Sequence, residues 1–271
     1  MAKKRILFIS QEISPYIPAT PESTLGKAIP SGVHGRSYEV RTFMPKYGSV
    51  NERRNQLHEV IRLSGMNIVI DDNDHPLILK VASLQPSRIQ VYFIDNDDYF
   101  QKLDDDIDPV GSNRADNDER AIFFARGTVE TVMKLRWEPA IIQCSGWMTS
   151  LNPLFLKRMF ATEPAFASTK IIYAPLSSRL QAPLDPELLR KLKEDGIPAK
   201  ELAPFKDMTP DTDMLHKIAI AYSDAVIFNE EPSEDLLAFV KERDIPYTII
   251  PMETQEAAPY LEFYESLMPA E

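Results

Sequence analysis

The chain has 271 residues, 44% of them apolar, which is enough for one large or two small domains whose core needs no disulfide or metal. Its 41 acidic and 30 basic residues give a net charge of −11, and such a surface repels phosphate backbones and anionic lipids, which argues against nucleic-acid and membrane partners. Cys144 is the one cysteine, and the sequence shows neither a signal peptide nor an apolar run of about 20 residues that could cross a bilayer, so we expect a cytoplasmic protein.

Short runs rich in Ile, Val, Phe and Tyr recur along the chain and predict buried strands. A parallel sheet that is covered on both faces needs strands that are apolar on both sides. In chain order the predicted strands are 5–10, 39–44, 88–95, 140–145, 170–174, 225–229 and 246–250. Residues 66–70 and 77–82 are expected to form a hairpin around 71–74.

Helices are predicted between most of these strands. Residues 118–135 place an apolar residue on one face at about every third or fourth position. Asp185-Pro186 and Thr209-Pro210 each put a capping side chain before a proline, which predicts helices over 186–195 and 210–223. Residues 233–243 and 257–268 are also helical by spacing. The alternation of strand and helix predicts an α/β fold with a mostly parallel sheet.

Two segments near the N-terminus carry a more specific pattern. The first predicted strand runs into SQEISPY (10–16), and the second lies in EVRTFMPKYG (39–48). Together they resemble the opening of the glycogen and starch synthases, where a Ser-Glu-x-x-Pro-Phe turn, a Lys-Thr-Gly-Gly loop and a helix precede a strand ending in Met-Pro-x-Tyr-Gly. Further blocks resemble the family in the same order, at 91–100, 115–120, 138–157, 170–175 and 216–228.

The resemblance implies a fold and an activity. Members of the family are two-domain glucosyltransferases of the GT-B type, which transfer glucose from a sugar nucleotide, usually ADP-glucose, to an α-1,4-glucan. It implies that residues 1–271 form a single Rossmann-like domain with three αβα layers, like the N-terminal half of these enzymes, and that an α-glucan and a sugar nucleotide are the candidate ligands. We expect the donor-binding C-terminal half to be absent from this chain.

The family's donor loop is replaced. Where the resemblance places Lys-Thr-Gly-Gly, this chain has Pro18, Ala19, Thr20 and Pro21. A phosphate cradle needs a cation and backbone N–H groups that reach the anion, whereas proline has no N–H and a fixed φ. We therefore expect a surface loop without a ligand at this position.

The family's His-Ala-His-Asp-Trp motif is also replaced, by residues 143–147. Gln143 and Ser145 stand where the histidines would be, and Trp147 is kept. Amide and hydroxyl groups still donate hydrogen bonds, but they carry no proton near neutral pH. Trp147 fits a core anchor and a sugar platform equally well at this level. Cys144 is expected to be a buried, inert thiol.

The best residual contacts with a glucan acceptor lie in another block. Asp116, Asn117, Glu119 and Arg120 match the family's Asp-Asn-x-Glu-Arg, although a helix cap explains Asp116 or Asn117 as well. The residual acceptor-side candidates are thus Asp116, Asn117, Arg120, Gln143, Ser145 and Trp147. Other family site positions have changed, at 175–177, 214 and 228–232, while Lys217 is kept.

Metal and cofactor chemistry is not indicated by the remaining polar residues. The histidines at 34, 58, 75 and 216 are not spaced as ligands and are expected to have surface or capping roles. The acidic runs Asp95–Asp98 and Asp104–Asp106 lack the pattern of a calcium loop and are expected to be solvated. The segment 48–60, which carries three basic side chains when Lys46 is included, is expected to be a surface face, with an anion or partner patch as the alternative.

Three hypotheses for the function follow. The first is a glycogen-synthase-like protein that is inactive alone, has no catalytic residue of its own, and acts in glucan binding or regulation. The second is an active glucosyltransferase whose donor half is supplied by a partner subunit. The third is a protein-interaction module or homodimer without sugar chemistry.

Overall fold

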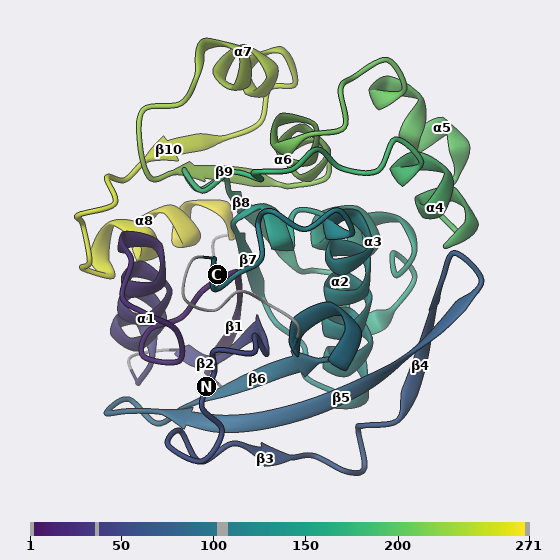
Figure 1. Cartoon of the computed structure of the whole chain (residues 1–271). Helices are drawn as coiled ribbons and strands as arrows, with labels where there is room; N and C mark the ends of the chain where they lie inside the picture. The colour runs from purple at the N-terminus through teal and green to yellow at the C-terminus, as the bar shows by residue number, and fades with distance from the viewer. Residues whose placement is uncertain (1–2, 36–37, 102–107, 269–271) are drawn as a thin grey trace.

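A computed structural model describes residues 3–35, 38–101 and 108–268 of the chain. A sheet in the strand order β10-β9-β8-β7-β1-β2-β6-β5-β3 runs through it (Figure 1). The strands are β1 (Lys4–Ser10), β2 (Tyr38–Pro45), β3 (His58–Glu59), β4 (Met66–Ile70), β5 (Asn73–Leu84), β6 (Ile89–Asp95), β7 (Ile141–Ser145), β8 (Lys170–Ala174), β9 (Ala225–Phe228) and β10 (Tyr247–Ile249). From β10 to β6 all neighbours are parallel, and β5, β3 and β4 add an antiparallel extension.

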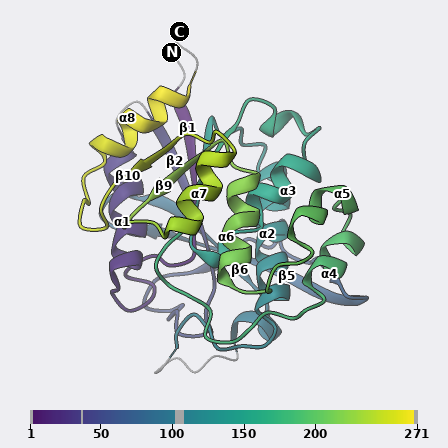
Figure 2. The same ribbon diagram turned by 90° about the horizontal axis from the view of Figure 1, so that it is seen from above.

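Helices cover both faces of the sheet. The helices are α1 (Pro21–Val33), α2 (Asn117–Lys134), α3 (Asn152–Arg158), α4 (Leu188–Glu194), α5 (Ala199–Leu202), α6 (Thr212–Ala221), α7 (Glu234–Glu242) and α8 (Ala258–Leu267). Figures 1 and 2 place α1 beside α8 on one side of the sheet, with α2 and α3 on the other. The predicted three-layer αβα fold with a mostly parallel sheet is therefore confirmed.

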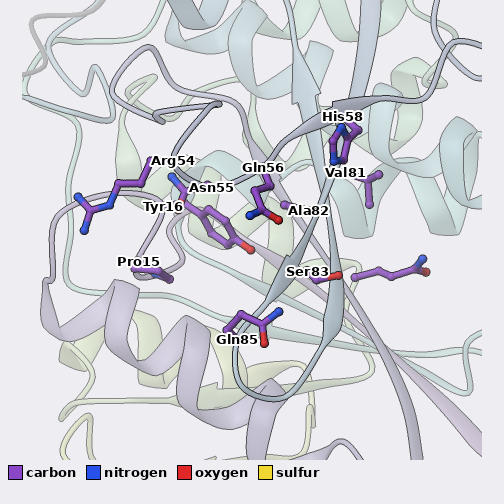
Figure 3. A pocket seen from close by; sticks show the side chains of 11 residues that line it. Pro15, Tyr16, Arg54, Asn55, Gln56, His58, Val81, Ala82, Ser83 and Gln85 are labelled. Carbon is purple, nitrogen blue, oxygen red and sulfur yellow. The ribbon is translucent and has the colours of Figure 1, made fainter.

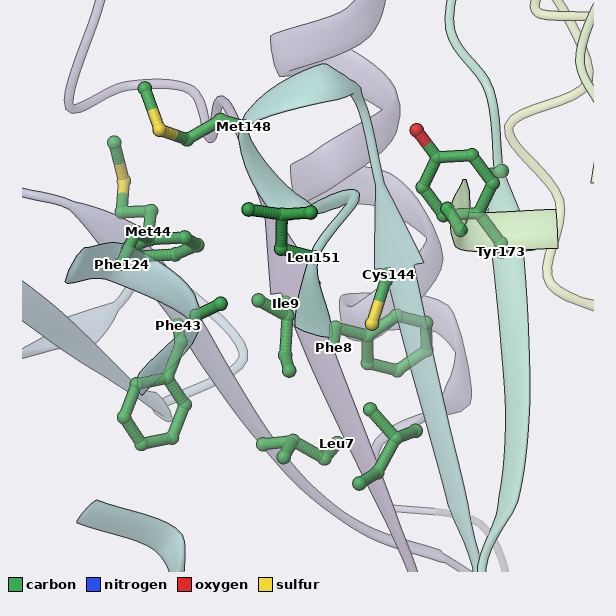
Figure 4. Close-up of a cluster of buried hydrophobic side chains, with 14 of the residues drawn as sticks. Leu7, Phe8, Ile9, Phe43, Met44, Phe124, Cys144, Met148, Leu151 and Tyr173 are labelled. Carbon is green, nitrogen blue, oxygen red and sulfur yellow. The ribbon is translucent and has the colours of Figure 1, made fainter. Parts of the chain in front are cut away.

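The core is built around β1, whose residues after Arg5 are buried on both faces. Leu7, Phe8 and Ile9 expose 2% of their surface or less, and Figure 4 shows them between side chains of β2 and β7. Cys144 lies in the same cluster with no exposed surface, and burial raises the pKa of its thiol well above the ordinary value. The prediction that Cys144 is buried is confirmed.

The predicted strands and the hairpin of β4 and β5 are present, but two predicted helix starts are wrong. α6 is capped by Asp211, whose Oδ1 accepts from the N–H of Met214 at 3.0 Å, and not by Thr209. α4 begins at Leu188 because the chain first makes a turn in which Asp185 accepts from the N–H of Glu187. Before α4 a turn with its own side-chain hydrogen bond thus comes between the proline and the helix, whereas before α6 the cap lies one residue after the proline.

Buried ion pairs attach α4 to α2. The Lys191 ammonium is 3% exposed and donates to Asp118 (2.8 Å), Glu119 (2.7 Å) and Asp185 (2.9 Å). Just beyond α4, Asp195 pairs with Arg126 of α2. Burial outweighs this partner and raises the pKa of Asp195 to about 6. These contacts fix one end of the helical layer.

Two further expectations about polar residues need correction. His216 is not at the surface: it is 1% exposed, because it lies one turn from Thr212 and from Ile220 on the inner face of α6. Asp95 is 1% exposed and is bound by Lys80 at 2.8 Å, so it is not part of a solvated run. Residues 104–106 lie outside the described residues.

Within the described ranges, no helix is long and apolar enough to cross a membrane. The same part of the chain holds no group of three or more His, Cys, Asp or Glu side chains placed to bind a metal ion.

Candidate functional site

The carboxyl ends of β1, β7 and β8 meet at one edge of the sheet. Ser10 pairs with Ser145, and the N–H groups of Gln11 and Gly146 extend the pairing to the next strand, at 3.1 and 3.0 Å. In open α/β sheets ligands bind outside this edge. At the ends of β1 and β7 lies a cavity of about 20 Å³, which is enough for a water molecule and too small for a glucosyl residue. A separate hollow of about 320 Å³, which shares Leu176 with it, lies farther along the same edge beyond β8 and β9. The lining residues of the smaller cavity are Phe8, Ser10, Gln11, Glu12, Glu22, Leu25, Gly26, Ile29, Pro30, Gln143, Ser145 and Leu176.

Residues 18–20, beside this cavity, lie in a surface loop as the sequence predicted, and the loop leads directly into α1, which begins at Pro21. Thr20 caps α1: its hydroxyl accepts from the N–H of Ser23 at 2.9 Å, and the Ser23 hydroxyl accepts from the N–H of Thr20 at 2.9 Å. Pro21 is the first helical residue, where a missing N–H leaves no helical bond unmade. The rings of Pro18 and Pro21 are exposed and do not line the cavity.

Two buried glutamates dominate the electrostatics of the cavity. Glu12 accepts from the hydroxyl of Thr20 at 2.8 Å and from the side-chain amide of Gln11 at 3.2 Å. Glu22 accepts from the N–H of Ser178 at 2.7 Å, and its second oxygen has no partner among the described residues. Burial raises the pKa of both carboxyls, and their mutual repulsion raises that of Glu12 further.

The wall opposite α1 is formed by the segment 143–146. The amide oxygen of Gln143 accepts from the hydroxyl of Tyr264 in α8, and its amide nitrogen donates to Ser145 at 3.3 Å. Gly146 has a φ of 89°, and a Cβ there would lie 2.7 Å from the amide oxygen of Gln11. The amide oxygen of Gln143 is thus already hydrogen-bonded to α8. The close approach of Gln11 leaves no room for a side chain at position 146.

Comparison with known proteins identifies the family. A profile described as the starch synthase catalytic domain matches residues 5–231. The chain belongs to the starch synthase catalytic domain family. It is 30% identical over 247 residues to the glycogen synthase of Chlorobium limicola, covering 88% of this chain and 50% of that protein. It is 35% identical over 171 residues to the glycogen synthase of Chlorobium chlorochromatii, covering 63% of this chain and 35% of the relative.

A solved structure supports the fold of this starch-synthase family member. The catalytic domain of starch synthase IV from Arabidopsis thaliana, bound to ADP and acarbose, superposes with a TM-score of 0.74 at 15% identity. The match covers 92% of this chain and 51% of that one. The chain therefore spans about half the length of the relatives it matches.

The predicted acceptor residues of the family's Asp-Asn-x-Glu-Arg block form a structural cluster at the start of α2. Arg120 exposes none of its surface and donates to the backbone carbonyls of Tyr99 (2.8 Å), Val110 (2.8 Å) and Gly111 (3.0 Å). Asn117, also fully buried, accepts from Arg120 at 2.6 Å. Burial lowers the pKa of Arg120 to about 10, so it is still charged at neutral pH.

Asp116 pairs with Arg114 at the edge of the same cluster. Asp116 makes no side-chain cap for α2. The side chains of Asn117 and Arg120 donate their hydrogen bonds to backbone carbonyls of the loop 108–114, which is a structural role. A role of Asp116, Asn117 or Arg120 in acceptor binding stays a prediction. Trp147 is fully buried, and its indole N–H has no partner among the described residues, which makes it a core residue.

Sequence reasoning missed Glu12 and Glu22 as determinants of this site. Glu12 lies inside the SQEISPY motif and Glu22 two residues after the cap, but nothing local shows that both side chains are directed inward. For Glu22, the sequence pattern that could have revealed its position is Thr20-Pro21-Glu22-Ser23, which is typical of a capped helix start with an acidic residue in the first turn.

Proposed function

We propose that this glycogen- and starch-synthase-like domain transfers no glucose by itself and acts in glucan binding or regulation. The observation that carries the proposal is the small, acidic cavity that is lined by Gln143 and Ser145 of the replaced histidine motif and lies beside the replaced donor loop. We further propose that residues 1–271 form one domain equivalent to the N-terminal half of these enzymes, which agrees with the half-length match to the relatives.

Charge is the first argument. The diphosphate of a sugar nucleotide would approach Glu22 in addition to Glu12, the glutamate that the family's Glu-x-x-Pro turn also has. Each is less than 10% exposed, and the family's lysine is absent. Two carboxylates in a poorly solvated cavity repel an anion much more strongly than they would in water. The first turn of α1 offers little compensation, since the N–H groups of Ser23 and Thr24 are already bound by Thr20.

Space is the second argument. A transition state for glucosyl transfer needs the sugar, the leaving diphosphate and stabilising donors in contact at one place. Here Gln143 is engaged by Tyr264, Leu176 lines the cavity, and about 20 Å³ remains. The space between α1 and the ends of β1 and β7 therefore does not admit a glucosyl residue without movement of its lining side chains.

The proposal is tested by incubating the purified protein with radiolabelled ADP-glucose or UDP-glucose and glycogen, with the Chlorobium limicola glycogen synthase as the positive control. We expect no incorporation above background. Incorporation that is abolished by Ser145→Phe, which fills the cavity, but not by the surface change Ser266→Phe would refute the proposal.

A second arm addresses a donor half supplied by a partner. The assay is repeated after adding the isolated C-terminal half of the same relative. We expect no incorporation, because the obstruction lies in this domain's own cavity. Incorporation that depends on both polypeptides would establish the two-subunit enzyme instead.

A further inference from the structure

A larger hollow lies outside the cleft. It has a volume of about 390 Å³ and lies between the loop after β1, the turn 54–58 and the end of β5 (Figure 3). We call it the amide groove; its lining residues are Pro15, Tyr16, Arg54, Asn55, Gln56, His58, Val81, Ala82, Ser83, Gln85 and Gln90. The loop that supplies Glu12 to the cleft supplies Tyr16 to this groove, so the two sites share one segment.

Tyr16 is the central polar group of the groove. Its ring is 5% exposed and packs edge-on against Phe93, with centroids 4.9 Å apart. Figure 3 shows its hydroxyl directed into the hollow, and among the residues that the structure describes none is hydrogen-bonded to it. Burial raises the pKa of Tyr16 to about 12, so the hydroxyl is a neutral donor and acceptor. A buried phenol with a free hydroxyl is a preformed anchor for a polar ligand.

Side-chain amides surround this hydroxyl. Gln56 and Gln85 are exposed and face it across the groove in Figure 3. Asn55 uses its nitrogen on the carbonyl of Asn51 at 2.9 Å, which leaves its oxygen for a ligand. β3 pairs only with Lys80 and Val81 of β5, so residues 82–84 have no strand partner on that side within the described chain. Their backbone groups add to the hydrogen-bonding capacity.

The turn that carries the amides is held rigidly. Asn51 accepts from the N–H of Arg54 at 2.8 Å, and the carbonyl of Glu52 accepts from the N–H of Leu57 at 2.9 Å. The Glu52 carboxylate is bound by Lys46 at 3.0 Å and by Lys80 at 2.6 Å. A ligand at the groove would therefore order little additional chain, which favours binding.

The charge of the groove selects the class of ligand. None of the described residues that line it is acidic, although the chain carries 41 acidic residues. Arg54 is a cation at its rim, but Figure 3 shows the guanidinium directed away from the Tyr16 hydroxyl. Amide, phenol and backbone groups both donate and accept, as the hydroxyls of a sugar require. A phosphate would need a cation that the interior does not offer.

We propose that the amide groove binds a neutral oligosaccharide, and that this is a site separate from the cleft. The further assignment to an α-glucan rests on the proposed function, whereas the assignment to a neutral saccharide rests on the groove alone. Tyr16, Gln56 and Gln85 contact the sugar.

The test is a titration of the full chain with maltohexaose, followed by the ¹H–¹⁵N NMR signals of the backbone and side-chain amides. We expect the signals of Gln56 and Gln85 to shift with saturation. Tyr16→Phe keeps the ring against Phe93 and removes only the hydroxyl, so we expect it to weaken binding by about three- to tenfold, the contribution of one neutral hydrogen bond. Tyr247→Phe, a tyrosine on exposed β10, is the matched control and should bind as the unmodified chain does.

Each outcome decides one of the two proposals. If cellohexaose or xylohexaose shifts the groove amides and maltohexaose does not, the groove is a saccharide site but the link to α-glucans fails. If no neutral hexasaccharide shifts them, or if Tyr16→Phe leaves the affinity unchanged, the groove proposal is overturned while the inactive cleft is unaffected. A maltohexaose response confined to Ser145 and Gly26 would also overturn it and would place the sugar in the cleft.

Discussion

Replacing Arg120 by methionine separates a structural role from a glucan-binding role. The substitution keeps a long, flexible side chain against Phe100 and removes the guanidinium. Three acceptors then lose the hydrogen bond that the structure gives them: the carbonyls of Tyr99 and Val110 and the side-chain oxygen of Asn117. The carbonyl of Gly111 keeps a second donor.

The cost follows from those three groups. A buried acceptor left without a partner costs about 1 kcal/mol or more, which gives about 3 kcal/mol in total, reduced somewhat because a charge no longer has to be desolvated. We therefore expect Arg120→Met to lower the free energy of unfolding by about 2–4 kcal/mol. With a urea m-value of about 3 kcal/mol/M, the midpoint should fall by about 1 M.

Urea unfolding followed by tryptophan fluorescence and by circular dichroism measures this shift, with the exposed Arg53→Met as the matched control. The control should stay within about 0.5 kcal/mol of the unmodified chain. An Arg120→Met protein that unfolds at the normal midpoint but loses affinity for maltohexaose would refute the reasoning, because it would make Arg120 a ligand contact.

Three further predictions concern buried charges. Glu22→Gln removes the repulsion that helps to raise the pKa of Glu12, so that pKa should fall, although burial keeps it above the ordinary value; ¹³C NMR titration of the carboxyl measures it, and an unchanged value would contradict the coupling. Asp195 has a folded pKa of about 6 against an ordinary 3.8, so its contribution to stability is present below pH 4 and lost as the pH rises through 6. Asp195→Asn should therefore flatten the plot of unfolding free energy against pH between pH 4 and 6. A plot that keeps its slope there would count against the assignment. Lys191→Met leaves the buried Asp118 carboxylate without its cation and should lower the free energy of unfolding by about 3–5 kcal/mol. Adding Asp118→Asn in a double variant should recover part of this loss. If the losses of the two single variants simply add in thermal or urea unfolding, the pairing is contradicted.

The fold was largely predictable because its strands are apolar on both faces. Arg5–Ser10 and the corresponding runs in β7 and β8 are short, nearly continuous apolar segments. Such segments are typical of strands in a parallel sheet that is covered on both faces. The helix starts were less predictable. A proline preceded by Asp185 or Thr209 indicates a chain reversal, but which residue caps the helix depends on hydrogen bonds made a few residues later.

The sequence located the candidate site along the chain but not its geometry. The family resemblance pointed to residues 18–21 and 143–147. Gln143 and Ser145 line the small cavity, and residues 20–21 form the start of α1 beside it. The engagement of Gln143 by Tyr264 joins residues 121 positions apart, and no local pattern encodes that contact. The same holds for the amide groove, where Tyr16 and Gln85 both line one hollow only because loop and strand end fold together. The predicted surface face at 48–60 does not extend to Lys46, which is 4% exposed and pairs with Glu52 at 3.0 Å.

Binding of ADP-glucose to the cleft tests the central claim most directly. The N–H signals of Gly26 and Ser145 report on the cavity, and Glu12→Gln/Glu22→Gln is a variant that removes its negative charge while keeping hydrogen-bonding oxygens. We predict that millimolar ADP-glucose leaves both signals of the unmodified protein in place. Saturable shifts of Gly26 and Ser145 in the unmodified protein, equal to those in the double variant, would contradict the account.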